Sequence, residues 1–176
     1  MTLTKSQFES FKEKDRMNRT LEGEAYWAFI QRPKVSEKYK TTTYTICLGL
    51  DENNIAKAES YGLTVKPADK AVPMPYVEIK RKVKPGVDPI EVKPTVVDSM
   101  QRPVPDGTLI GNKSKVIVKF GTYWHEAGSG GVGNTLFKVQ IRDLVEYKPV
   151  DNGLIMDEGG YKAPGSHTQS SSDFDE

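Results

Sequence analysis

The sequence contains little of what most catalytic and metal sites are built from. Its 176 residues include one cysteine, Cys47, and two histidines, His125 and His167. A single cysteine excludes an internal disulfide and a thiolate metal cluster. Two histidines so far apart provide neither a histidine-rich zinc site nor a convincing Ser-His-Asp set. We therefore expect a protein that is not an enzyme and that needs no metal or cofactor.

Long hydrophobic runs are also lacking. No apolar stretch approaches the roughly 20 residues that a membrane-spanning helix needs. Residues 1–15, MTLTKSQFESFKEKD, lack the apolar core of a secretory signal peptide. We expect a chain that works in the cytoplasm and has no membrane partner.

Neither sign of charge dominates the whole chain, but the two signs are distributed unevenly. The formal net charge is +1. Residues 151–176 contain six acidic residues and one basic residue, so this segment carries −5 and residues 1–150 carry +6. A basic body with an acidic tail is typical of a protein whose body binds a polyanion.

A glycine-rich segment, GSGGVG at residues 128–133, lies in the middle of an alternating region. Its spacing matches G-x-G-x-x-G, but the dinucleotide site needs a helix directly afterwards. An alternating, strand-like sequence follows here, so a dinucleotide site is excluded. The segment is typical of a mobile loop instead.

Residues 109–147 predict one long β-hairpin around that loop, because apolar and polar residues alternate in both arms. The apolar positions are Val116, Val118 and Phe120 in the first arm and Phe137, Val139 and Ile141 in the second. Lysines occupy the outer face of the first arm, which ends in Tyr-Trp-His at residues 123–125. A surface that binds single-stranded nucleic acid needs cations beside aromatic rings, because the cations pair with phosphates and the rings stack on unpaired bases.

The rest of the chain predicts further strands at residues 24–32, 41–50 and 76–84, a short extended piece at 95–98 and one short helix at 51–61. Residues 1–20 are expected to form a flexible arm, 21–150 one domain and 151–176 a disordered acidic tail. The fold class is mainly β: a small antiparallel barrel or sandwich with one short helix and long loops.

Three stretches carry a resemblance to a known family. They are VVD at residues 96–98, LIGNKSKV at 109–116 and LFKVQIRDLV at 136–145, with AYWAFIQRPK at 25–34 fitting the same layout. Over residues 22–150 the chain resembles the phage-encoded single-stranded DNA-binding proteins. The resemblance implies an OB-fold barrel that coats single-stranded DNA without sequence preference during phage DNA replication, recombination or repair in the cytoplasm of an infected bacterial host cell.

The same resemblance implies a role for the acidic C-terminal tail. It would recruit replication proteins, such as the DNA polymerase or the helicase/primase, and compete with DNA for the basic groove. The tail residues expected to bind a partner are Asp173, Phe174, Asp175 and Glu176. The sequence leaves open whether a second copy of the chain is a further partner.

The DNA-binding candidates are the cations and aromatics of the predicted strands and loops. The first cations are Lys80, Arg81, Lys82, Lys84, Lys113, Lys115 and Lys119. Arg32, Lys34, Lys38 and Lys40 in the first loop follow as second choices. The stacking candidates are Tyr76, Tyr123 and Trp124, with Tyr44 and Trp27 behind them.

The strand positions of Trp27, Tyr123 and Trp124 limit which of these rings we expect to stack on bases. A tryptophan in the middle of a strand is more often part of the core, which applies to Trp27. Tyr123 and Trp124 are neighbours in a strand and should point to opposite faces, so one of them at most is expected to stack.

Two other interpretations remain open at this point. In a carbohydrate- or protein-binding β-module, the aromatics would line the site and the lysines would be incidental, which predicts weak salt dependence. A single-stranded RNA-binding protein of the same fold would differ in its response to the 2′-OH.

Overall fold

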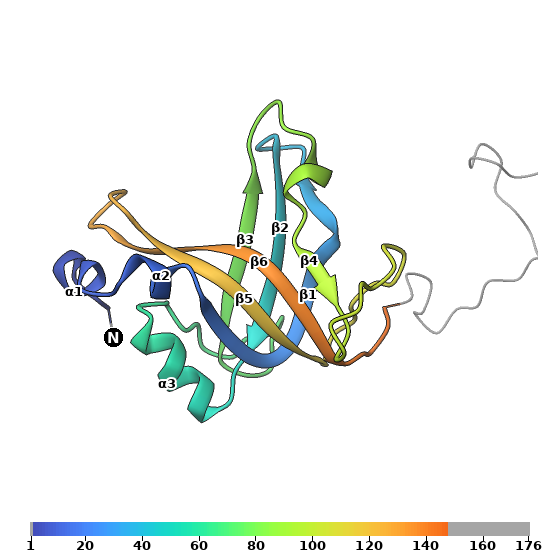
Figure 1. Ribbon diagram of the computed structural model, residues 1–176, viewed down its shortest axis with the longest axis horizontal. Coiled ribbons are helices and arrows are strands. Elements are labelled where there is room, and N and C mark those ends of the chain that lie inside the picture. Colours follow the sequence, from blue (N-terminus) through green and yellow to red (C-terminus); the bar gives the residue numbers. More distant parts are fainter. Residues whose placement is uncertain (1, 148–176) are drawn as a thin grey trace, which may run out of the picture.

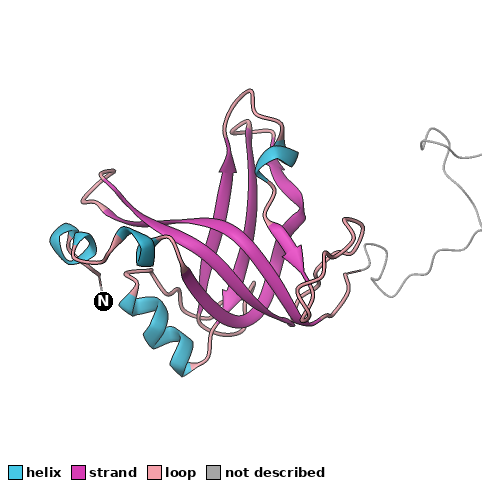
Figure 2. Cartoon of the chain, viewed as in Figure 1, coloured by secondary structure: helices cyan, strands magenta, loops and turns pink. Residues whose placement is uncertain are grey.

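The computed structural model describes residues 2–147, and the predictions for the tail at 151–176 lie outside the described residues. Strands make up most of the fold, and the helices are short (Figures 1 and 2). The elements are, in chain order, α1 (Lys5–Glu9), α2 (Glu13–Arg16), β1 (Arg19–Ser36), β2 (Thr41–Gly49), α3 (Glu52–Ser60), β3 (Tyr76–Val83), the 3-10 helix η1 (Pro89–Val92), β4 (Thr95–Val97), β5 (Ser114–His125) and β6 (Gly131–Asp143).

The strands form one sheet in the order β3-β2-β1-β5-β6-β4. All neighbours are antiparallel except β4, which runs parallel to β6. The sheet curls so that β5 and β6 cross over the β1–β2–β3 layer (Figure 1). The predicted fold class, a mainly β, OB-fold-like barrel with little helix, is confirmed.

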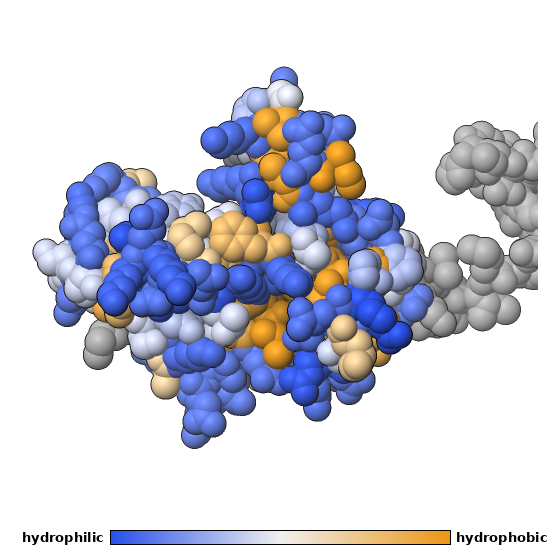
Figure 3. Space-filling view, in the orientation of Figure 1, coloured by the Kyte–Doolittle hydropathy of each residue, from blue (hydrophilic) through white to orange (hydrophobic). Residues whose placement is uncertain are grey.

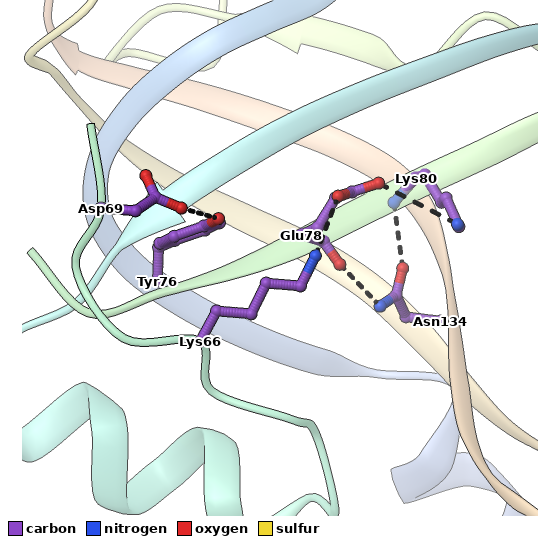
Figure 4. Close-up of polar contacts among 6 residues, drawn as sticks. All are labelled: Lys66, Asp69, Tyr76, Glu78, Lys80 and Asn134. Carbon is purple, nitrogen blue, oxygen red and sulfur yellow. Dashed lines mark hydrogen bonds and ion pairs between the residues drawn. The ribbon is translucent and has the colours of Figure 1, made fainter. Parts of the chain in front are cut away.

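One side chain joins the two sides of the barrel between β3 and β6. The Lys80 backbone N–H donates to Asn134 Oδ1 at 3.0 Å, and Asn134 Nδ2 donates to the Glu78 carbonyl at 3.0 Å. The side-chain amide of Asn134, on β6, thus makes the pair of bonds that a strand backbone would offer to β3 (Figure 4). The contact between β3 and β6 that closes the barrel therefore includes bonds from the Asn134 side chain.

The core lies inside the curl, where inward positions of all six strands meet. It is apolar throughout, as alternation along each strand predicts. Its fully buried members include Leu21, Ile30, Ile46, Leu48, Ile79, Val116, Val118, Phe120, Leu136 and Val139. Helix α3 covers one end with Ala58, and Asp51 caps it by accepting a hydrogen bond from the Asn54 backbone N–H at 2.8 Å. The predicted helix at 51–61 is confirmed.

The strand predicted at 24–32 is longer and less regular than expected. β1 spans 18 residues and continues through Pro33. Its register against β2 shifts between Tyr26 and Phe29 and again between Phe29 and Lys34. Trp27 lies in the first shift with a φ of 50°, and its side chain is 50% exposed. The expectation that Trp27 belongs to the core is therefore wrong, because a bulge turns the ring outward.

The N-terminal arm is packed against the barrel, which corrects the expectation of a loosely held segment. Phe8 of α1 is only 1% exposed, and its ring centroid lies 6.1 Å from that of Trp124 on β5. Lys5 pairs with Glu126 at 2.6 Å, and the Arg16 carbonyl accepts from the Thr122 hydroxyl at 3.0 Å. Residues 2–18 thus cover the outer end of the β5–β6 hairpin (Figure 1).

The predicted hairpin at 109–147 is confirmed, with one change in its second arm. A register shift between Lys119 and Phe120 brings Leu136 opposite Phe120. Leu136 is therefore the buried residue, and Phe137 is only partly covered. The Phe137 ring lies under the Arg81 guanidinium instead, with 5.7 Å between the guanidinium carbon and the ring centroid. Alternation alone could not reveal this bulge, because it moves every later residue by one position.

Within residues 2–147, no helix is long and apolar enough to cross a membrane. The same part of the chain holds no group of three His, Cys, Asp or Glu side chains that could bind a metal ion. Figure 3 shows a largely hydrophilic face with hydrophobic residues on the upper lobe around η1 and in the middle of the face.

Candidate nucleic-acid interface

The outer surface of β1, β2 and β3 carries two cross-strand rows of side chains. Phe29 lies opposite Thr45, which lies opposite Lys80. Opposed residues of antiparallel strands point to the same side. The side chains that alternate with these rows on β2 and β3, such as those of Ile46 and Ile79, are buried in the core. The first row therefore faces outward.

A second row lies beside the first and consists of Lys34, Thr43 and Lys82. We call the two rows together the strand face. Its centre is formed by short threonine side chains, with an aromatic ring and a lysine at the β1 edge and two lysines at the β3 edge. Lys34 Nζ lies 5.8 Å from the centroid of the Phe29 ring, which is a cation–π geometry.

A groove lies at the β1 edge of the strand face, and we call it the β1 groove. Its volume is about 490 Å³. Trp27, Phe29, Arg32, Asn112 and Tyr147 are among its lining residues. Two hydrogen bonds fix Trp27 there: its backbone N–H donates to Asn112 Oδ1 at 2.9 Å, and its indole Nε1 donates to the Ala71 carbonyl at 2.8 Å.

A second groove lies at the β3 edge, and we call it the hairpin groove. Its volume is about 460 Å³. Lys80 and Lys82 of β3 line one side, and Tyr123 and His125 of β5 line the other, with Asn134 between them. Tyr123 is 46% exposed, so a ring face is available at this end as well.

Residues 66–75 form a strap that covers the remaining part of the sheet surface beyond the strand face. Its buried contacts are Tyr26, Val72 and Tyr76, which pack together away from the main core. Asp69 holds the strap by accepting from the Val72 backbone N–H at 2.9 Å and from the Tyr76 hydroxyl at 2.8 Å (Figure 4).

These contacts change the titration of both partners. The backbone N–H of Val72, followed by the Tyr76 hydroxyl, lowers the pKa of Asp69. The hydrogen bond to Asp69 raises the pKa of Tyr76 to about 12. The strap is thus held by an ionised carboxylate and a neutral phenol across the neutral pH range.

The charges of the hairpin groove are not equivalent. Glu78 lies 3.4 Å from Lys66 Nζ and 3.9 Å from Lys80 Nζ, so one carboxylate partly neutralises two lysines (Figure 4). Among the described residues, Lys82 and Lys34 form no ion pair with a carboxylate. The uncompensated positive charge of the strand face therefore lies in the Lys34–Lys82 row.

The structure brings together part of the predicted set. Lys80, Lys82 and Tyr123 line the hairpin groove, while Trp27 and Arg32 line the β1 groove. Lys34 lies on the strand face between the two grooves.

The expectation for three predicted stacking residues is corrected, because two are buried and the third packs on Phe8. Tyr44 is 2% exposed, and its hydroxyl donates to the Pro89 carbonyl at 2.9 Å. Tyr76 is 8% exposed and lies under the strap. Trp124 packs on Phe8, while Tyr123 next to it is open, so the expectation that the two rings diverge is confirmed. Tyr44 and Tyr76 therefore offer no free ring face to a base, and the half-buried Trp124 ring is engaged by Phe8.

Several predicted cations lie outside both grooves. Lys115 is flanked across the strands by Glu24 and Asp143. Arg81 lies over Phe137 rather than in the hairpin groove. The remaining predicted cations outside the grooves are Lys38, Lys40, Lys84, Lys113 and Lys119, all of them exposed.

The groove-lining residues that sequence reasoning missed include Phe29, Lys66, Asn112, Asn134 and Tyr147. Phe29 carried a usable signal, because aromatics on both faces of a strand require one set to be exposed. Asn112, Lys66 and Tyr147 lie in connections whose path depends on long-range packing, and no local pattern marks them.

Comparisons with known proteins bear on the fold. No family model and no curated protein matches the sequence. Solved structures of phage single-stranded DNA-binding proteins share its fold, which is the fold that the sequence resemblance implied.

Two of these solved structures show the extent of the similarity. Gp2.5, a single-stranded DNA-binding protein encoded by bacteriophage T7, aligns with a TM-score of 0.51 and 17% identity, covering 83% of this chain and 99% of that one. The single-stranded DNA-binding protein from bacteriophage Enc34, in complex with ssDNA, aligns with a TM-score of 0.50 and 12% identity, covering 70% of this chain and 86% of that one. At these identities the similarity establishes the common fold.

Proposed function

We propose that this protein binds single-stranded DNA across the strand face, from the β1 groove to the hairpin groove, and coats it without strict sequence preference. The observation that carries the proposal is the continuity of the outward rows. An exposed ring stands at each end, namely Trp27 and Tyr123, and lysines stand at both edges. Rings stack on bases of any sequence, and lysines neutralise phosphates.

The dimensions of the surface fit such a ligand. Neighbouring strands lie about 4.8 Å apart, so β1 to β3 spans about 10 Å before the grooves are added. The threonines in the centre leave room for a backbone to pass over β2, while the strap blocks the adjacent part of the sheet. The fold shared with phage single-stranded DNA-binding proteins supports the same ligand.

We further propose that the coating serves phage DNA replication, recombination or repair inside the host cell. The acidic segment at residues 151–176 would recruit replication proteins and compete with DNA for the lysines. The opposite net charges of the segment and the body, −5 and +6, support the competition.

A fluorescence titration tests the binding proposal. Oligo-thymidine should quench the emission of Trp27, and higher salt should weaken the binding. The expected slope of log K against log salt is about −0.7 for each phosphate contacted. A duplex of the same length and an oligo-uridine RNA serve as controls. No binding to single-stranded DNA, checked by gel shift, would refute the proposal, and tighter binding to RNA would redirect it.

Lys82→Ala and Lys115→Ala form a matched pair in the same titration, because each removes one exposed lysine from a strand. Lys82→Ala should lower the affinity and reduce the salt slope by about 0.7. Lys115→Ala should change little, since Glu24 and Asp143 flank that lysine and it lines neither groove. Equal effects of the two variants would place the DNA elsewhere on the barrel.

A further inference from the structure

The β1 groove has features that the general coating function does not require. Trp27 adopts a φ of 50°, a conformation that is unusual for a large side chain. Both of its N–H groups are bound within the protein, to Asn112 Oδ1 and to the Ala71 carbonyl. The indole ring is therefore held in one position at the groove. Its N–H and the Trp27 backbone N–H are both already hydrogen-bonded within the protein. Backbone strain held in place in this way is typical of ligand sites.

The groove has an apolar interior. Phe29, Ile30, Leu109 and Ile110 line it, and Tyr147 adds an aromatic ring to those of Trp27 and Phe29. Its volume of about 490 Å³ lies within the range of roughly 300–1,000 Å³ that is common for small-ligand pockets. One nucleoside fits such a space, with the base against Trp27.

The polar side chains at this groove that remain free are mainly donors. The Trp27 N–H fixes the Asn112 oxygen toward the β1 backbone, so the NH₂ group of Asn112 is the end left for a ligand. Arg32 adds a guanidinium, which only donates. Gln31 is already occupied at both ends, by the Pro105 carbonyl and by Lys93 Nζ. The described lining residues include no Asp or Glu. The Tyr147 hydroxyl can either donate or accept a hydrogen bond.

We infer that the β1 groove binds one unpaired base of the single strand and favours guanine over adenine. This inference rests on the proposed function. Guanine presents two adjacent acceptors, O6 and N7, which match an arginine fork or an amide NH₂. Adenine places its N6 amino donor beside N7, so a donor from the protein meets a donor from the base. The coat would then tolerate every sequence and still prefer a guanine at this position.

Paired oligonucleotides test the inference by fluorescence anisotropy with the full chain. The probes are labelled d(TTG)₄ and d(TTA)₄, which differ only in the purine. The expected preference for the guanine probe is roughly threefold to tenfold, as one or two added hydrogen bonds produce. Replacing guanine by 7-deazaguanine removes the N7 acceptor and should reduce the preference.

Asn112→Asp is the decisive variant. It keeps an oxygen for the Trp27 N–H and replaces the NH₂ donor by a second acceptor, so the preference should vanish or reverse toward adenine. Asn53→Asp, an equal charge change at an exposed position on α3, should lower both affinities alike and leave their ratio unchanged. Equal affinity of the unmodified protein for both probes, or an unchanged ratio in Asn112→Asp, would overturn the inference while the binding function stands. Failure to bind either probe would overturn both.

Discussion

At the scale of single residues, Asn134 replaces part of a missing strand ladder. β3 and β6 are the two strands that must meet for the barrel to close, and they are not neighbours in the hydrogen-bonded order. The Asn134 amide accepts from the Lys80 N–H and donates to the Glu78 carbonyl, so both backbone groups of β3 are satisfied. Since Lys80 and Asn134 also line the hairpin groove, the same bonds set the width of the binding surface.

Replacing Asn134 by Ala should therefore destabilise the barrel. Two backbone groups of β3 lose partly buried partners, which costs about 1–3 kcal/mol in the free energy of unfolding. Urea denaturation measures the change, with Asn53→Ala at an exposed helical position as the control. A loss no larger than that of the control would show that the seam holds without the amide.

Residue-level prediction from the sequence succeeded where local pattern decides and failed where a bulge intervenes. The alternation of Val116, Val118 and Phe120 predicts their burial correctly, because a regular strand repeats every two residues. Trp27 does not follow this two-residue repeat, since the register shift beside it turns the ring outward. Tyr44 is an aromatic that the sequence offers for stacking, but it lies on the same side of its strand as Ile46 and Leu48 and is buried.

At the scale of elements, the strap is a segment whose position depends on few contacts. Residues 66–75 look like an irregular linker in sequence, and prolines prevent a regular element there. Asp69 nevertheless folds the segment onto the sheet through Val72 and Tyr76, while Lys66 and Tyr76 exchange backbone hydrogen bonds. The bond from Asp69 to the Val72 N–H is local, but no sequence pattern predicts where the strap lies, because its packing against Tyr26 comes from the tertiary fold. The helix α3, with its local cap at Asp51, was predictable for the opposite reason.

The strap should loosen in acid. The pKa of Asp69 is lowered in the folded state, so its contribution to stability is complete above the unfolded value of about 3.9 and is lost as the pH falls through the folded value. The pKa of Tyr76 is raised to about 12, so its contribution is complete below about 10 and is lost only as the pH rises toward 12. The strap contacts are thus intact at neutral pH.

The substitution Asp69→Asn tests this dependence. The variant should be less stable than the unmodified protein at pH 7. The difference should be smaller at pH 3, because that pH lies below the unfolded pKa of about 3.9 and protonation then favours the unfolded chain. Urea denaturation at both pH values measures it, and Glu37→Gln in the exposed turn between β1 and β2 provides the control. A difference that stays constant between the two pH values would mean that the charge of Asp69 does not hold the strap.

At the scale of the whole molecule, the sequence predicted the mainly β barrel but not how its parts cover one another. The N-terminal arm looked loose because it is polar, yet Phe8 anchors it on Trp124 at the β5–β6 hairpin. That contact joins residues that are more than a hundred positions apart, which a local pattern does not register. The arm fixes the β5 end from which Tyr123 reaches the hairpin groove, so the binding surface depends on packing from both ends of the described chain.

The charge distribution of the whole chain leads to the last prediction, which concerns residues 151–176. If their net charge of −5 competes with DNA for a body of +6, deleting them should strengthen binding to oligo-thymidine several-fold at low salt. The gain should fade as salt rises, because the screening length shrinks from about 30 Å at 0.01 M to about 10 Å at 0.1 M. A full-length variant with the six acids changed to Asn and Gln separates charge from bulk, and it should bind as tightly as the truncated chain. Unchanged or weaker binding by both variants at low salt would exclude competition, whereas a gain in the truncated chain alone would assign the effect to steric cover.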